Sequence, residues 1–204
     1  MKLNDKNFVI GITGGVGAGK STVLAVLENE YGAHVYQADR ISRYMTTKGQ
    51  RAYDKVVKLF GEEILMPDGN PDRTRMAQIV FNDPEKREAL NAIIHPTVCR
   101  YLKGKAAGRE GLVVLEAALP SESKFPEICD EIWYIYARPN VRIERLSQSR
   151  GYTKEKSEEI MASQLSDEEF RSLADVVIDN SGSLDEMEEQ IAAQLDRIKS
   201  KYNF

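Results

Sequence analysis

The sequence has few cysteines and no long run of apolar residues or of charges of one sign. Its two cysteines, Cys99 and Cys129, belong to no C-x-x-C pattern, which excludes a disulfide framework and a cysteine-rich zinc site and suits a reducing cytoplasm. With 28 basic and 32 acidic residues the net charge is −4, which disfavours non-specific binding to nucleic acid. No apolar run approaches the length that crosses a bilayer, and residues 1–7 lack the apolar centre of a signal peptide. We therefore expect no nucleic-acid or membrane partner.

A glycine-rich segment stands out against this background. Residues 14–21 (GGVGAGKS) match the phosphate-binding pattern G-x-x-x-x-G-K-[ST] at every fixed position. Glycines let successive backbone N–H groups surround an anion, while Lys20 reaches the outer phosphates and the Ser21 hydroxyl ligates magnesium. Residues 8–13 predict a buried strand and residues 21–27 predict the start of a helix. The order strand, loop, helix favours a nucleotide site over a merely flexible turn. The expected nucleotide-binding residues of this segment are Gly15, Val16, Gly17, Ala18, Gly19, Lys20, Ser21 and Thr22.

A carboxylate follows the second predicted strand. This strand covers residues 32–38, after a turn at Gly32, and Asp39 stands at its end. Ligands of open parallel sheets bind beyond the carboxyl ends of the strands, so Asp39 should face the same crevice as the phosphate-binding loop and is the leading general-base candidate. An equally weighted alternative is that Asp39 only caps a helix beginning near Arg40.

Residues 40–107 are predicted to be mostly helical, with a break at residues 66–71 (MPDGNP). Asp83 and Pro84 mark a helix start, and the dipeptide at residues 95–96 interrupts a helical pattern. A helical insertion after the second strand is well placed to hold an acceptor over the phosphates. Within it, Arg73 precedes an apolar run. A histidine beside apolar neighbours, such as His95, is more often structural than catalytic.

The next two strands are predicted at residues 111–116 and 132–136. The first ends in Glu116. A carboxylate at the tip of an apolar strand beside a phosphate-binding loop is a candidate helper for magnesium, directly or through water. The alternative, at about even weight, is a solvated strand end.

An arginine-rich helix follows, opened by Pro139 and ending near Gly151. The segment that contains this helix, residues 138–151, carries four arginines within thirteen positions, which could close over a transferring phosphate as a lid. They are Arg138, Arg142, Arg145 and Arg150. A plain charged surface helix is the alternative that composition alone favours, and the position after the fourth strand favours the lid.

The remaining elements complete one α/β domain. A capping box begins at Ser166, a fifth strand is predicted at residues 175–179, and a last helix after Ser183 carries an apolar stripe. We therefore predict a five-stranded parallel sheet with a helical acceptor-binding insertion and a helical lid. The predicted core comprises residues 1–39, 108–137 and 173–204, the insertion residues 40–107 and the lid residues 138–172.

With these features in order, the chain resembles the dephospho-CoA kinase family of P-loop kinases over nearly its full length. The residues that carry the resemblance are residues 11–22, Ala38 and Asp39, residues 91–96 (NAIIHP), Arg145, Arg150, Gln164 and residues 177–182 (VIDNSG). The loop alone indicates a nucleotide site, and the ordered set is far more specific.

The resemblance implies transfer of a phosphoryl group from ATP, with Mg²⁺, to the ribose 3′-hydroxyl of dephospho-CoA. Asp39 occupies the position of the family's catalytic aspartate, and Lys20 and Arg145 would stabilise charge on the transferring group. Asn180 and Gly182 resemble the loop against which the family's adenine packs. The acceptor-binding residues that we expect are Asp39, Arg73, His95 and Glu122. A monomer or weak homo-oligomer is expected.

The chain departs from the family pattern in three places. Gln37 stands where members often carry the first aspartate of Asp-Ala-Asp, so only Asp39 keeps its match. Residues 118–122 (ALPSE) replace a Pro-Leu-Leu-x-Glu segment with a shifted proline. One arginine of the lid, Arg150, lies one position from where some members place it, which favours Arg145.

Two other functions fit parts of the sequence. A P-loop kinase acting on a nucleoside monophosphate would share the core and the lid. Residues 179–182 (DNSG) match the D-x-x-G pattern of GTPase switches, but they follow the last strand and no N-K-x-D motif is present. The switch-protein reading is accordingly disfavoured.

Overall fold

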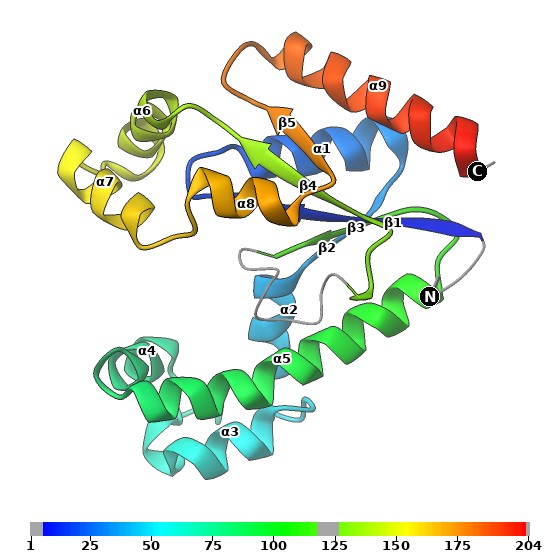
Figure 1. The fold of residues 1–204 in the computed structure, drawn as a ribbon. Coiled ribbons are helices and arrows are strands. Elements are labelled where there is room, and N and C mark those ends of the chain that lie inside the picture. The colour runs from blue at the N-terminus through cyan, green and yellow to red at the C-terminus, as the bar shows by residue number, and fades with distance from the viewer. Residues whose placement is uncertain (1–5, 118–126, 203–204) are drawn as a thin grey trace.

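The computed structural model describes residues 6–117 and 127–202 of the chain. Helices fill the stretch between β2 (His34–Gln37) and β3 (Gly111–Glu116) (Figure 1). The strands are β1 (Asn7–Thr13), β2 (His34–Gln37), β3 (Gly111–Glu116), β4 (Glu131–Tyr136) and β5 (Val176–Asp179). The α-helices are α1 (Lys20–Tyr31), α2 (Ala38–Met45), α3 (Tyr53–Phe60), α4 (Arg73–Asn82), α5 (Pro84–Ala107), α6 (Pro139–Arg150), α7 (Lys154–Ala162), α8 (Asp167–Leu173) and α9 (Leu184–Tyr202). A short 3₁₀ helix, η1, spans Glu62–Ile64.

The strands form one sheet in the order β2-β3-β1-β4-β5, with every neighbouring pair parallel. This confirms the predicted five-stranded parallel sheet. Because β1 is central, the glycine-rich loop that follows it leaves the middle of the carboxyl edge, where open sheets bind ligands. Three strands come together there, since Glu116 of β3 lies in register with Gln37 of β2 and Ile12 of β1.

Different helices cover the two faces of the sheet. Alternate residues of a strand point to opposite faces, so Phe8, Ile10 and Ile12 pack with α1 and α9, while Val9 packs with the insertion helices. The helical side chains on the first face include Val23, Leu27, Met187, Ile191 and Leu195. Those on the second face include Met45, Val56, Phe60, Ile94, Val98 and Leu102. Burial on both faces explains the nearly continuous apolar runs of β1, β3 and β4.

The start of α2 differs from the sequence-based prediction. The strand ends at Gln37 and the helix begins at Ala38, so Asp39 lies in the first helical turn rather than after a strand. The N-cap residue is Gln37, and the alternative that Asp39 caps this helix is therefore wrong. A carboxylate in the first turn is still favourable, because it complements the positive end of the helix dipole.

The predicted interruption at residues 95–96 is also wrong, because α5 runs through Pro96 without a break. Proline removes one backbone N–H from the hydrogen-bond ladder. Apolar side chains on either side of it, Ile94, Val98 and Leu102, are buried in one core cluster and keep the helix continuous across the gap.

Predicted helix ends are confirmed at three places. The Asp83 carboxylate accepts from the Lys86 N–H at 3.0 Å and starts α5. Ser166 and Glu169 form the reciprocal capping box of α8. Gly151 ends α6 with φ 65°, a left-handed conformation that favours glycine.

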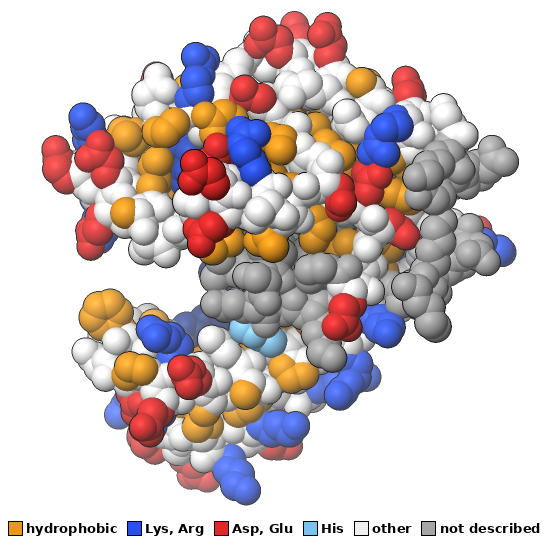
Figure 2. Space-filling model, in the orientation of Figure 1, with side chains coloured by type: hydrophobic (Ala, Val, Ile, Leu, Met, Phe, Trp, Pro, Cys, Tyr) orange, Lys and Arg blue, Asp and Glu red, His pale blue; other side chains and the backbone are white. Residues whose placement is uncertain are grey.

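The helices between β2 and β3 extend away from the sheet on one side, and α6 and α7 extend beside its carboxyl edge (Figure 1). The surface is deeply notched between the insertion and the part of the molecule that carries α6 and α7 (Figure 2). Among the described residues, none of the helices combines the length and apolar character needed to cross a membrane.

Candidate active site

A cavity of about 780 Å³ lies at the carboxyl edge of the sheet. Segments far apart in the sequence line it: the glycine-rich loop, the ends of β2 and β3, helix α6 and the loop after β5. Its lining residues include Gly15, Val16, Gly17, Gly19, Lys20, Ser21, Thr22, Asp39, Glu116, Arg145, Arg150, Gln164, Asn180 and Gly182. The structure thus gathers most of the predicted site residues around one space.

The loop at the base of the cavity depends on glycine conformations. Gly14, Gly17 and Gly19 have φ of 148°, 76° and 85°, in a region that other residues rarely adopt. A side chain at Gly14 would also collide with the backbone oxygen of Ile135. Gly19 is the N-cap of α1 and supplies no side-chain cap, so the helix presents its first N–H groups and its positive dipole end to this loop, as anion sites do.

Lys20 lies along the loop. Its Nζ donates hydrogen bonds to the carbonyl oxygens of Gly14, at 2.7 Å, and Gly15, at 3.3 Å. Burial lowers the pKa of Lys20, and the negative charges of Glu116 and Asp39 oppose this effect. The ammonium group is therefore held in place and attracted to the two carboxylates of the same cavity.

The two carboxylates have different environments. Glu116 is 8% exposed, and burial raises its pKa; the Lys20 charge opposes this effect while the Asp39 charge adds to it. Asp39 is exposed on the first turn of α2. An exposed carboxylate can meet a substrate hydroxyl, whereas a buried one beside a lysine suits a structural or metal-assisting role.

Helix α6 contributes arginines to the opposite wall. Arg145 lies against the loop, with its Nη1 3.4 Å from the carbonyl oxygen of Ala18, and Arg150 lines the same cavity. Arg138 does not line the cavity, and its Nη2 donates to the Ser181 carbonyl oxygen at 3.4 Å. Two of the four predicted lid arginines therefore face the nucleotide region of the cavity.

The loop after β5 completes the site. Asn180 is buried, and its Nδ2 donates to the carbonyl oxygen of Ala18 at 2.8 Å. Its backbone N–H donates to Tyr136 O at 2.8 Å, which extends the pairing of β5 with β4. Gly182 follows in the cavity lining. The DNSG segment therefore supports the phosphate-binding loop directly.

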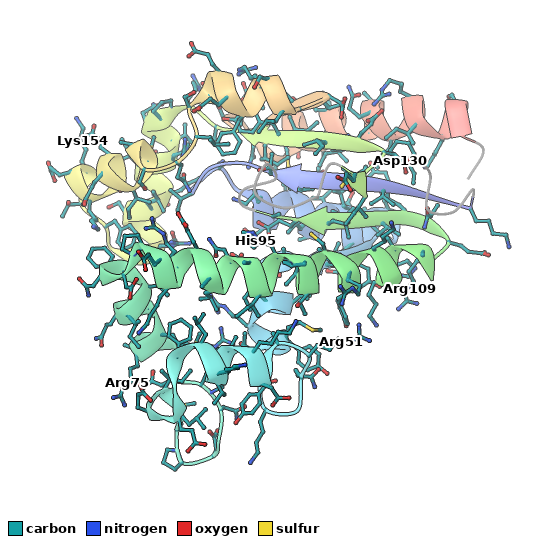
Figure 3. The ribbon with its side chains drawn as sticks, turned by 60° about the horizontal axis from the view of Figure 1, so that its bottom comes forward. Arg51, Arg75, His95, Arg109, Asp130 and Lys154 are labelled. Carbon is teal, nitrogen blue, oxygen red and sulfur yellow. The ribbon has the colours of Figure 1, made fainter. Side chains whose placement is uncertain are left out.

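The predicted acceptor residues are not all at this cavity. Arg73 begins α4, and its Nη2 donates to the carbonyl oxygen of Arg43 at 2.7 Å, at the end of α2. His95 lies midway along α5 and is half-buried (Figure 3). Neither lines the cavity that contains Asp39. Glu122 lies outside the residues that the structure describes.

Two contacts of the loop were missed by sequence reasoning. The side-chain oxygen of Gln164 accepts from the Val16 N–H at 2.9 Å, and Arg142 donates to the Val16 carbonyl oxygen at 2.8 Å. The sequence indicates Gln164 only through the family resemblance, and Arg142 only as one of four arginines. No local spacing links positions 148 and 126 residues apart from Val16 in the chain.

The central phosphate-binding loop, the parallel sheet and the arginine-bearing helix beside them define a P-loop kinase. Solved structures agree on this fold. Shikimate kinase from Acinetobacter baumannii, 14% identical, superposes with a TM-score of 0.57 over 95% of this chain and 96% of that chain. TT1252 from Thermus thermophilus, 32% identical, gives a TM-score of 0.79 over 94% of this chain and 97% of that chain.

Sequence comparison narrows the class to one family. The dephospho-CoA kinase family model matches residues 8–186. The dephospho-CoA kinase of Carboxydothermus hydrogenoformans is 40% identical over 197 residues, which cover 95% of each chain. The chain therefore belongs to the dephospho-CoA kinase family.

Proposed function

We propose that this protein transfers the γ-phosphoryl group of ATP to the ribose 3′-hydroxyl of dephospho-CoA, giving CoA and ADP. The observation that carries the proposal is the meeting of Lys20, Asp39 and Arg145 around one cavity over the phosphate-binding loop, in a chain of the dephospho-CoA kinase family.

In the proposed reaction Asp39 accepts a hydrogen bond from the acceptor hydroxyl and takes its proton as the oxygen attacks phosphorus. The bond from phosphorus to the bridging oxygen of ADP breaks as the new bond forms. Lys20, the N-terminus of α1 and Arg145 stabilise negative charge on the transferring group. No covalent enzyme intermediate is needed, because the loop and α2 would hold donor and acceptor at the same carboxyl edge of the sheet.

The oxygen donors around the cavity suit Mg²⁺, which uses few protein ligands and keeps waters and substrate phosphates. The Ser21 hydroxyl is exposed next to Lys20, and the carboxylates of Glu116 and Asp39 line the same space. We propose Ser21 as the direct ligand, with Glu116 or Asp39 assisting through water. Bound magnesium would neutralise phosphate charge during transfer.

We propose that the adenine of ATP lies beside Asn180 and Gly182, and that the insertion, residues 40–107, holds the acceptor. The position of Arg73 supports this division. Arg73 is exposed and lies beside Arg43. Its Nη2 donates hydrogen bonds at the end of α2, the helix that carries Asp39. A pair of neighbouring arginines suits the diphosphate of dephospho-CoA. His95 and Glu122 complete the proposed acceptor set, and residues 138–172 form the proposed lid.

Oligomeric state, cellular location and macromolecular partners are also proposed from the sequence. We propose a monomer or weak homo-oligomer that acts in the cytoplasm without nucleic-acid or membrane partners. The supporting observations are the modest net charge of −4 and the presence of Cys99 and Cys129 as thiols rather than as a disulfide.

One assay tests the proposed function. Purified protein is incubated with Mg²⁺ and ATP and with each of a panel of acceptors: dephospho-CoA, the four nucleoside monophosphates and shikimate. ADP release is measured, and the phosphorylated product is identified by mass. We expect turnover with dephospho-CoA alone. Turnover with a nucleoside monophosphate and none with dephospho-CoA would refute the proposal and support the rival kinase.

A further inference from the structure

One residue of the phosphate-binding loop, Val16, is held through both of its backbone polar groups by side chains from outside the loop. Its carbonyl oxygen accepts from Arg142 Nε at 2.8 Å, and its N–H donates to Gln164 Oε1 at 2.9 Å. Arg142 Nη2 also donates to the same Gln164 oxygen at 3.1 Å. The three groups form a closed set of hydrogen bonds between the loop, helix α6 and the segment after α7.

The glycines on either side of Val16 give independent evidence for this contact. A side chain at Gly15 would collide with the guanidinium group of Arg142. A Cβ at Gly17 would lie 2.9 Å from the backbone oxygen of Arg142 and 3.2 Å from its Cβ. The absence of side chains at these two positions is therefore what lets α6 approach the loop so closely.

Arg142 and Arg145 use the same helix differently. The Arg142 side chain is half-buried, burial lowers its pKa, and two of its nitrogens are directed at Val16 and Gln164. Arg145 lies three positions further along α6, on the same side of the helix, and lines the cavity. A helix fixed at position 142 fixes the approach of the guanidinium at position 145.

We propose that Arg142 and Gln164 are a pair of positioning residues: by binding both backbone groups of Val16 they fasten α6 to the phosphate-binding loop and so place Arg145 over the transferring phosphoryl group. The inference rests on the proposed kinase function and adds two residues that act through Arg145 and the loop. The planar fork of an arginine is required, because a lysine cannot bridge two acceptors with fixed geometry.

Substitutions test the pair through turnover. We expect Arg142→Lys and Gln164→Leu each to lower kcat for dephospho-CoA about tenfold, as loss of hydrogen bonds at a partly buried polar site does. The Kd for a non-transferable ATP analogue should change less than about threefold, because Lys20 and the α1 N-terminus are intact. Gln164→Glu, which keeps an acceptor oxygen, should restore most of kcat at saturating ATP. Gln194→Leu, on α9, is the matched control and should leave kcat unchanged.

Double variants show whether the two residues act as a unit and through Arg145. The variant that combines Arg142→Lys with Gln164→Leu should be no slower than the slower single variant. In an Arg145→Ala background, Gln164→Leu should lower kcat by less than about twofold, since the group that it positions is gone. Multiplicative losses in either combination would overturn the inference. So would near-normal kcat in Arg142→Lys, which would mean that charge alone matters.

A readout without an acceptor separates this inference from the proposed function. Amide exchange of Val16, followed by NMR, should quicken by about tenfold or more in Gln164→Leu and stay unchanged in Gln194→Leu, since only the first removes the hydrogen-bond acceptor. Unchanged exchange would refute the pairing itself. If Val16 exchange quickens in Gln164→Leu as expected but the wild-type protein does not turn over dephospho-CoA, the proposed acceptor is refuted and the contact between Gln164 and Val16 is supported. The turnover experiments would then be run with the acceptor that the panel identifies.

Discussion

Different interactions stabilise the phosphate-binding loop and the helical insertion. Hydrogen bonds from distant segments fix the loop, through the side chains of Arg142, Gln164 and Asn180. The insertion is held mainly by apolar packing in one core cluster. Its members there include Met45, Val56, Phe60, Ile64, Ile94 and Val98. Directed hydrogen bonds set atoms to within tenths of an ångström, whereas apolar packing sets shape and tolerates substitution.

This difference matches the two halves of the proposed reaction. P-loop kinases share a nucleoside triphosphate as the phosphoryl donor, so a loop of fixed geometry suits the donor side. The acceptor differs between them, and a packed helical insertion can change its shape while the sheet and loop stay constant. Hydrogen bonds also join segments of the insertion, such as Tyr53 Oη to Gly69 O at 2.8 Å and Arg73 Nη2 to Arg43 O at 2.7 Å, but they lie around a core of apolar side chains.

The largest effect is expected at Asp39, where the two halves meet. Asp39→Asn keeps the size of the side chain and removes its ability to take a proton. We expect kcat to fall roughly 10²-fold or more, and the affinity for ATP to stay nearly unchanged, because a general base contributes to transfer and not to donor binding. Steady-state kinetics with dephospho-CoA and calorimetry with an ATP analogue measure the two quantities.

The control for Asp39 is its neighbour Arg40, which is also exposed on the first turn of α2. If Arg40→Gln and Asp39→Asn reduced kcat equally, the role of Asp39 would be to stabilise the helix start. Unchanged turnover in Asp39→Asn would likewise remove the general-base assignment and leave a favourable helix-dipole contact.

The next largest effect tests the donor side alone. Arg145→Ala should lower kcat by about 10²-fold, as loss of one group that stabilises transition-state charge does. Binding of an ATP analogue should weaken much less. Lys154→Ala is a matched loss of positive charge, because Lys154 lies at the outer end of α7, pairs with Glu158 at 3.8 Å and is exposed (Figure 3). An equal loss of turnover in both variants would indicate a general effect of lid charge.

The sequence predicted the loop-bearing half well because its signals are local. Residues 14–21 carry glycine, lysine and serine at fixed spacing, and each residue type has a backbone or charge requirement that needs no knowledge of the rest of the fold. The parallel sheet followed from buried apolar runs separated by helices. The position of Asp39 at the carboxyl edge also followed from these rules, although the strand ends at Gln37, one residue earlier than predicted, and the helix begins at Ala38.

Features that depend on tertiary contacts were not predictable. Pro96 marks a helix break by its local chemistry, but burial of residues on both sides keeps α5 continuous. The contact of Gln164 with Val16 joins segments that no sequence period relates. The sequence indicates Arg73 as an acceptor-binding candidate, and only the structure reveals that it also donates to the end of α2. A single sequence carries no signal for such pairings.

A smaller effect is expected from one conservative substitution in each of the two apolar core clusters, the one under α1 and α9 and the one in the insertion. Ile10 and Ile64 are both fully buried, the first under the sheet face covered by α1 and α9 and the second within the insertion. Ile10→Val and Ile64→Val should each cost about 0.5–1.5 kcal/mol of unfolding free energy, or a few degrees in Tm. We expect only Ile64→Val to raise KM for dephospho-CoA, by about two- to threefold. If Ile64→Val changed the Kd for ATP as much as the KM for dephospho-CoA, the donor and acceptor sides would not be independent.

The smallest effect that we expect comes from the cost in stability of burying the Glu116 carboxylate beside the phosphate-binding loop. Burial raises the pKa of Glu116 above its ordinary value of 4.5, so the folded protein holds this proton to higher pH than the unfolded chain does. Stability contributed by the neutral form is therefore present at low pH and is lost as pH rises from about 4.5 through the raised pKa. Gln is neutral throughout, so the Tm of Glu116→Gln relative to wild type should increase between pH 4 and pH 7.

The gain in Tm should be modest, on the order of 2 °C, because the Glu116 charge also attracts Lys20 and this attraction is lost in the variant. Thermal unfolding at pH 4 and pH 7 measures it, and Ile64→Val, which carries no charge, should show no change in its Tm difference between the two pH values. A Tm difference for Glu116→Gln that is independent of pH would mean that the carboxylate is fully compensated by Lys20. The donor half would then carry no electrostatic penalty, and the contrast with the apolar insertion would be one of geometry alone.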